Sequence, residues 1–103
     1  MAVNNNTTIS ADISGAGINV EAVVRLTASV TEEFVQPSTA QFKRRLNNGS
    51  WISVGPTFTL TPQQEAWRIV QTVSYRDTSV IDQNNYHYYL EIDATLQDAG
   101  APQ

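Results

Sequence analysis

Hydrophobic and polar residues alternate over two long segments of the chain. Every second residue from Ile18 to Val30 is apolar, and the positions between them are polar except Val23. The same alternation returns from Tyr86 to Leu96. Successive side chains of a β-strand point to opposite faces, whereas a helix would distribute these residues around its axis. The pattern therefore predicts long strands over residues 18–31 and 86–96, each with one face in a core.

Weaker alternation and turn residues predict the remaining elements. The expected strands cover residues 7–14, 39–46, 51–54, 57–60 and 66–75. Asn48-Gly49 predicts a hairpin after the second of these, because both residue types tolerate the positive φ of a type I′ turn. No window shows sustained helical spacing. We expect an all-β fold, an antiparallel β-sandwich (jelly-roll-like) of about seven strands.

The length of 103 residues fits one domain over residues 1–103. We expect residues 1–14 to form an N-terminal arm or an edge strand, and residues 97–103 a flexible tail. Hydrophobic residues make up 41% of the chain and charged residues only 16%, so Thr, Ser, Asn and Gln must cover much of the surface. That composition is typical of extracellular, virion or fibre β-proteins.

The net charge and the absence of cysteine restrict the kinds of partner and site that we expect. The formal charge is -4, which disfavours a surface built to neutralise phosphates, so we expect no nucleic acid. Cysteine is absent, which excludes disulfides and thiolate metal sites. No secretory signal is visible at the N-terminus, and no apolar run reaches the roughly 18 residues of a membrane helix. We expect no membrane partner.

The sequence has few of the side chains that enzymes use for catalysis. His87 is the only histidine and falls on the polar face of the last long strand. No nucleophile motif such as Gly-x-Ser-x-Gly accompanies it. Asp and Asn residues gather in the loop 76–85, but they lack the regular alternation of a calcium loop. We expect no catalytic residue, no metal, no cofactor and no enzymatic activity.

Two side-chain sets remain as binding candidates. Trp51 and Tyr89 are the aromatic residues that the core needs least, and flat exposed rings can stack on sugars, so they form a candidate ligand platform. The run Lys43-Arg44-Arg45 is either a solvated strand with one paired arginine or a contact for a sulfated glycan or another subunit. Strand alternation sends Arg44 toward the core, at a sheet edge or paired with an acid.

The segment before the first strong strand has a second possible use. Ile9, Ala11 and Ile13 alternate with polar residues, and Gly15-Ala16-Gly17 follows them. This segment is either an edge strand of its own domain or an arm that adds to the sheet of a neighbouring subunit. In both cases Ile9, Ala11 and Ile13 are the candidate assembly residues.

Three stretches carry a resemblance to known structural proteins. They are Gln41-Phe42-Lys43-Arg44-Arg45 with the Asn48-Gly49 hairpin, Thr72-Val73-Ser74-Tyr75-Arg76-Asp77, and Tyr86-His87-Tyr88-Tyr89-Leu90-Glu91-Ile92. Together they resemble jelly-roll and β-sandwich domains of bacterial spore-surface fibres, appendages and phage tail fibres, over about half of the chain. The sequence departs from that group in lacking a collagen-like stalk and any cysteine.

The resemblance implies a structural role with self-association into homo-oligomers or filaments, including filaments joined by exchanged strands. We therefore expect a non-enzymatic structural subunit at the surface of a cell, spore or virion, which self-associates through sheet edges. The alternative is a carbohydrate- or receptor-binding module that uses Trp51 and Tyr89.

Overall fold

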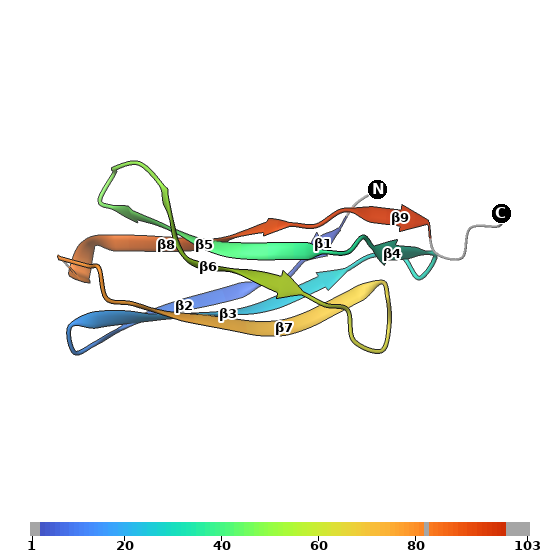
Figure 1. The fold of residues 1–103 in the computed structure, drawn as a ribbon, viewed down its shortest axis with the longest axis horizontal. Coiled ribbons are helices and arrows are strands. Elements are labelled where there is room, and N and C mark those ends of the chain that lie inside the picture. Colours follow the sequence, from blue (N-terminus) through green and yellow to red (C-terminus); the bar gives the residue numbers. More distant parts are fainter. Residues whose placement is uncertain (1–2, 82, 99–103) are drawn as a thin grey trace.

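The computed structural model describes residues 3–81 and 83–98, and it forms two antiparallel β-layers packed face to face (Figure 1). The body is elongated, with principal extents of 55 × 24 × 20 Å. Its one helical element in the described ranges is the 3-10 turn η1 (Gln83–Asn85). The predicted all-β antiparallel sandwich is confirmed.

The first sheet is built around β3 (Gly17–Thr27). β7 (Arg68–Asp77) pairs with one edge of β3 over its whole length. The short β1 (Asn4–Asn5) and then β2 (Thr8–Ser14) pair with the other edge. The seven residues of β2 keep an unbroken register with β3, from Thr8 opposite Val23 to Ser14 opposite Gly17.

The second sheet has the order β6-β5-β8, formed by β6 (Ile52–Leu60), β5 (Ser38–Leu46) and β8 (Tyr86–Asp93). β4 (Glu32–Phe34) precedes β5 in the chain, and β9 (Leu96–Asp98) follows β8. β4 and β9 pair with each other in a short antiparallel ladder that continues from the pairing of β5 with β8. The Val35 amide donates to the Thr95 carbonyl at 2.9 Å between the two ladders. Residues 97 and 98 of the predicted tail therefore lie in a strand, and residues 99–103 lie outside the described part.

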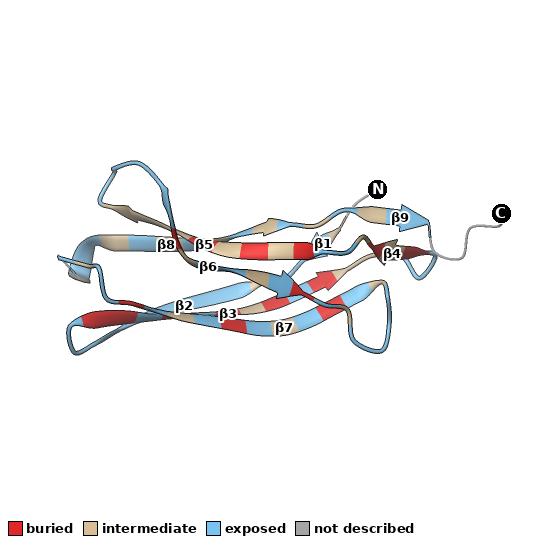
Figure 2. Cartoon of the chain, in the orientation of Figure 1, coloured by how far each residue is buried: buried red, intermediate tan, exposed pale blue. Residues whose placement is uncertain are grey.

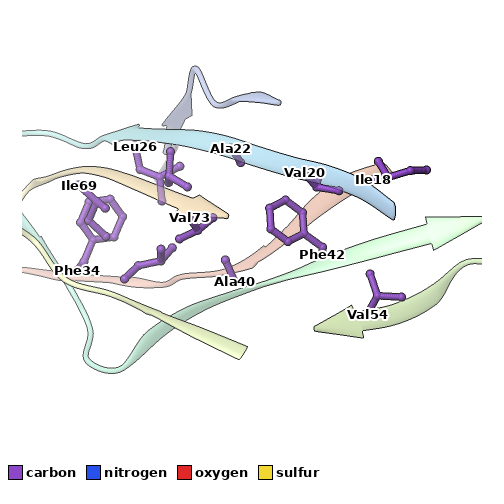
Figure 3. Close-up of a cluster of buried hydrophobic side chains, with 12 residues drawn as sticks. Ile18, Val20, Ala22, Leu26, Phe34, Ala40, Phe42, Val54, Ile69 and Val73 are labelled. Atoms are coloured by element: carbon purple, nitrogen blue, oxygen red, sulfur yellow. The ribbon is translucent and has the colours of Figure 1, made fainter. Parts of the chain in front are cut away.

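The core lies between the two layers, and its main contributor is the inward face of β3 (Figure 3). The alternation predicted for this strand is confirmed from Ile18 to Leu26. The buried hydrophobic residues are Ile18, Val20, Ala22, Val24, Leu26, Phe34, Ala40, Phe42, Val54, Leu60, Ile69 and Val73. They come from both sheets, so the layers depend on each other for stability.

The first long strand ends earlier than predicted. β3 stops at Thr27, and Val30 is 69% exposed. The pairing with β7 ends where the Ala28 amide donates to the Trp67 carbonyl, and the chain then turns, with the Glu32 amide donating to the Ser29 carbonyl. The apolar alternation up to Val30 therefore overstates the strand by residues 28–31.

The two predicted strands 51–54 and 57–60 form the single strand β6, which runs through Pro56. Proline is tolerated there because β6 is an edge strand of its sheet and its register with β5 shifts at this point. Gly55 supplies the irregular backbone with a φ of 75°. The predicted hairpin joins β5 to β6, but the positive φ falls on Asn47 rather than on Asn48-Gly49.

Candidate assembly surface

β2 is exposed along its whole length. Each of its seven residues is exposed, while bands of buried residues mark β3 and β7 in the same layer (Figure 2). Within the described ranges β2 pairs with β3 alone, so its outer edge presents unpaired backbone groups. A fully exposed strand at a free edge is a template for pairing with another chain.

The predicted assembly residues lie on the inward face of β2. Ile9, Ala11 and Ile13 stand directly opposite the core residues Ala22, Val20 and Ile18 of β3. Their β3 partners are at most 3% exposed, whereas Ile9 is 40% and Ile13 51% exposed. The core face of the first sheet thus continues onto β2 without being covered there.

The structure places residues 8–14 in the chain's own sheet. Gly15, with a φ of 59°, and Ala16 form the turn that joins β2 to β3. The segment is an edge strand in this structure, and its use as an arm toward a second chain is a separate hypothesis. Residues 1 and 2 lie outside the described part.

β8 lies on the same side of the sandwich as β2 and is also incompletely covered. Its inward residues Tyr86, Tyr88, Leu90 and Ile92 pack against the core but stay only half-buried. Among residues 8–14 and 86–93, the structure has no hydrogen bond or ion pair that joins the two strands. We call the apolar border formed by Ile9, Ala11, Ile13, Tyr86, Tyr88, Leu90 and Ile92 the open seam.

The opposite side, between β6 and β7, is closed by side chains. The Gln71 amide nitrogen donates to the Thr59 carbonyl at 2.9 Å, and its oxygen accepts from the Thr61 amide at 3.0 Å. The Tyr75 ring lies against Gly55, where a β-carbon would come within 2.9 Å of the ring. The two sides of the sandwich therefore differ: side chains bridge the two sheets between β6 and β7, whereas no hydrogen bond or ion pair among residues 8–14 and 86–93 joins β2 to β8 at the open seam.

A buried ion pair fixes the position of β8 near one end of the open seam. Asp77 at the end of β7 is fully buried, and its Oδ2 accepts from Arg44 Nη1 at 2.7 Å and from the Tyr88 hydroxyl at 2.7 Å. Its Oδ1 accepts from the amide and the hydroxyl of Ser79. Because β5, β7 and β8 all contribute, this cluster ties one sheet to the other.

The surroundings of Asp77 decide its protonation. Burial alone raises the pKa of this carboxyl, but hydrogen bonds from Tyr88, Arg44 and Ser79 outweigh burial and lower it below 3.8. The pKa of Tyr88 is raised by burial and by the hydrogen bond that its hydroxyl donates to Asp77. Asp77 is therefore a charged acceptor with both oxygens engaged, and its role is structural.

Arg76 holds the end of β2 that leads into β3, at the same end of the sandwich as the Asp77 cluster. Its guanidinium donates to the Ser14 carbonyl at 2.8 Å and to Asn19 Oδ1 at 2.9 Å. Gly17 allows this approach, since a β-carbon there would lie 3.0 Å from the Asp77 carbonyl oxygen and 3.1 Å from the guanidinium. Arg76 thus reaches from β7 across β3 and holds the last residue of β2.

The predicted platform residues Trp51 and Tyr89 meet on the outer face of the second sheet. Their ring centroids are 4.7 Å apart in an edge-to-face arrangement, and they are 39% and 38% exposed. The Arg45 guanidinium lies 4.7 Å from the Trp51 centroid. Arg45 thus occupies one side of the indole, which leaves less ring surface for a ligand.

The residues weighed for catalysis or metal binding do not converge. His87 is exposed on the outward face of β8. No group of three or more His, Cys, Asp or Glu side chains in the described ranges is placed to hold a metal ion. In the loop 76–85, Asp77 is committed to the buried cluster, and Asp82 lies outside the described residues.

A cleft of about 530 Å³ lies at the far end of the sandwich, between β4 and the β6–β7 loop. Its two carboxylates are engaged: Glu33 accepts from Gln97 Nε2 at 2.6 Å, and Glu65 from Trp67 Nε1 at 3.2 Å. Each of these carboxylates thus has a hydrogen-bond donor of its own within the described residues.

The Asp77 cluster is the feature that the sequence did not reveal as a unit. The alternation of β5 directed Arg44 inward, with a sheet edge or an acidic partner as the alternatives. β5 is the central strand of its sheet, and the partner is Asp77, 33 positions further along the chain. No helix among the described residues has the length and apolar character needed to cross a bilayer.

Comparison of the chain with protein-family models, with curated proteins and with solved structures finds no match.

Proposed function

We propose that the protein is a non-enzymatic structural subunit that self-associates through sheet edges, as a component of a fibre, appendage or virion. The observation that carries the proposal is the complete exposure of β2, including Ile9 and Ile13 on the face that continues the core. An exposed apolar edge of this kind favours aggregation unless a specific partner covers it.

The anchoring of the β2 edge supports a specific contact. Arg76 holds the end of β2, and the Asp77 cluster holds β8. A surface that is already ordered loses less conformational freedom on binding than a mobile segment does, so preorganisation favours association. A free arm would lack this advantage, and we therefore place the contact at the β2 edge rather than in a detached N-terminal segment.

Light scattering after size exclusion, over a range of protein concentrations, tests the proposal together with negative-stain microscopy. We expect the mean mass to rise with concentration and the largest species to be regular oligomers or filaments. A protein that remains monomeric at millimolar concentration would refute self-association.

The second candidate is a carbohydrate- or receptor-binding module, favoured by the contact between Trp51 and Tyr89 on an exposed face. Its test is a glycan array followed by titration of Trp51→Ala and Tyr89→Ala for any sugar that binds. Binding that both substitutions abolish supports this candidate, and an empty array removes its carbohydrate form.

A further inference from the structure

β2 lacks the protection found on both edges of the second sheet. Lysine, proline, bulges and charged side chains commonly keep edge strands from pairing with another chain. β6 contains Pro56 beside the irregular Gly55, and β8 carries Glu91 and Asp93. β2 contains neither lysine nor proline, pairs with β3 without a bulge, and has Asp12 as its sole charge.

The sequence of β2 is close to a mirror image of itself about Ala11. It reads Thr-Ile-Ser-Ala-Asp-Ile-Ser, so that residues at equal distances from Ala11 belong to similar classes. The outermost positions are hydroxyl residues, the next are both isoleucine, and the innermost are Ser10 and Asp12. If two copies of β2 paired antiparallel about a two-fold axis at Ala11, each residue would face the residue at the same distance on the other side of Ala11 in the second copy.

We propose that β2 of one subunit pairs antiparallel with β2 of a second copy, about a two-fold axis at Ala11. This inference rests on the proposed self-association and specifies its first contact. Directly opposite residues in such a pair lie on the same face of the sheet. Ile9 of each copy faces Ile13 of the other, and the two Ala11 residues face each other between these two pairs. The sheet β7-β3-β2 of one copy is thereby joined, through the two β2 strands, to the same sheet of the other copy.

Other registers are poorer. A shift by one residue in either direction would bring the inward face of one copy against the outward face of the other, which places isoleucine opposite serine, threonine or aspartate. An axis at Asp12 would set the two Asp12 carboxylates directly opposite each other, and like charges so placed are destabilising. With the axis at Ala11, Asp12 faces the Ser10 hydroxyl instead, and all seven residues of β2 are paired.

A charge swap tests the register. Ser10→Asp places a carboxylate opposite Asp12 of the other copy at two symmetric positions, and we expect dimerisation to weaken by roughly two- to thirtyfold. Adding Asp12→Lys to this variant converts both repulsive pairs into attractive ones. Dimerisation of the double variant should return to the wild-type level or exceed it in analytical ultracentrifugation.

The matched control is Ser74→Asp. Ser10 and Ser74 lie on opposite sides of Glu21, as its direct partners on β2 and β7. Both substitutions therefore place a carboxylate beside Glu21, but only Ser10→Asp changes the β2 edge. We expect Ser74→Asp to dimerise like the wild type, whereas weakening equal to that of Ser10→Asp would overturn the register.

Cross-linking gives an independent readout, because the chain has no native cysteine. Ala11→Cys puts two thiols opposite each other at the axis, within the distance that a disulfide spans, and oxidation should yield a covalent dimer. Ser14→Cys, which would face Thr8, should cross-link much more slowly. Faster cross-linking through Ser14→Cys overturns the axis at Ala11.

The outcomes separate this inference from the proposed function. Assembly that is insensitive to Ser10→Asp and gives no Ala11→Cys dimer overturns the β2 pairing, while self-association through another edge stands. A strictly monomeric wild type overturns both.

Discussion

The Arg44 guanidinium lies 2.7 Å from the fully buried Asp77 carboxylate and joins the central strand of one sheet to an edge strand of the other. The Asp77 side chain is inaccessible to solvent, and the Arg44 side chain is only 11% exposed. Taking two charges out of water is costly, and the pair is tolerated because Tyr88 and Ser79 supply further hydrogen bonds to Asp77.

Removing one partner of this pair should be far more damaging than the loss of an exposed ion pair. Arg44→Ala leaves a buried carboxylate without its counter-charge, and we expect a loss of about 3 kcal/mol in the free energy of unfolding. Chemical denaturation measures the loss. In the Asp77→Asn background the same substitution should cost less, and equal costs in both backgrounds would show that the two residues are not coupled.

The lowered pKa of Asp77 makes part of the stability depend on pH. Since the folded pKa lies below the unfolded value of 3.8, the folded state binds fewer protons between the two values, and stability rises with pH there. The contribution is full above 3.8 and is lost as the pH falls from there through the folded pKa. The advantage of the wild type over Asp77→Asn should be constant near neutrality and shrink in this acidic window. An advantage that persists undiminished in strong acid contradicts the assignment.

The sequence predicted the core better than the surface, for a physical reason. A period of two shows which residues of a strand share a face, and this was sufficient for Ile18 to Leu26 and for the inward direction of Arg44. It does not show whether a second sheet covers that face. Ile13 and Ile18 each belong to an alternating segment and stand opposite each other on one face, yet one is exposed and the other buried.

Partners distant in sequence could not be predicted, for the same reason. The meeting of Trp51 with Tyr89 depends on the registers of β5 with β6 and with β8, which one strand's pattern does not specify. The continuous strand through Pro56 was missed because proline normally interrupts a ladder, and its tolerance depends on β6 being at an edge.

The pair Ile13 and Ile18 gives a direct measure of the uncovered edge. Ile18→Ala removes buried methyl groups from the core and should cost about 2–5 kcal/mol in the free energy of unfolding. Ile13→Ala, on the same face and directly opposite, should cost below about 1 kcal/mol in the monomer because water already reaches this side chain. Thermal or denaturant unfolding at low concentration measures both, and similar costs would show that β2 is covered.

Gly55 is required both for its backbone conformation and for space. Gly55→Ala forces a side chain into a φ of 75° and against the Tyr75 ring, whereas Gly15→Ala meets a comparable φ of 59° with its nearest neighbour at 3.7 Å. We expect Gly15→Ala to cost about 1–2 kcal/mol from the left-handed backbone alone. Gly55→Ala should exceed that cost, and equal melting temperatures for the two variants would show that Tyr75 yields freely.

A designed disulfide separates edge pairing from strand exchange. Thr8 and Val23 are direct partners on β2 and β3, so the double substitution Thr8→Cys with Val23→Cys ties β2 to its own sheet when the chain is oxidised. If subunits associate by adding edge to edge, the locked protein should assemble as well as the reduced one, since β2 never has to leave β3. If they exchange residues 1–14 as arms, locking should block assembly and reduction should restore it. Light scattering before and after reduction distinguishes the two, and loss of assembly in the locked form alone would contradict edge pairing and establish the arm.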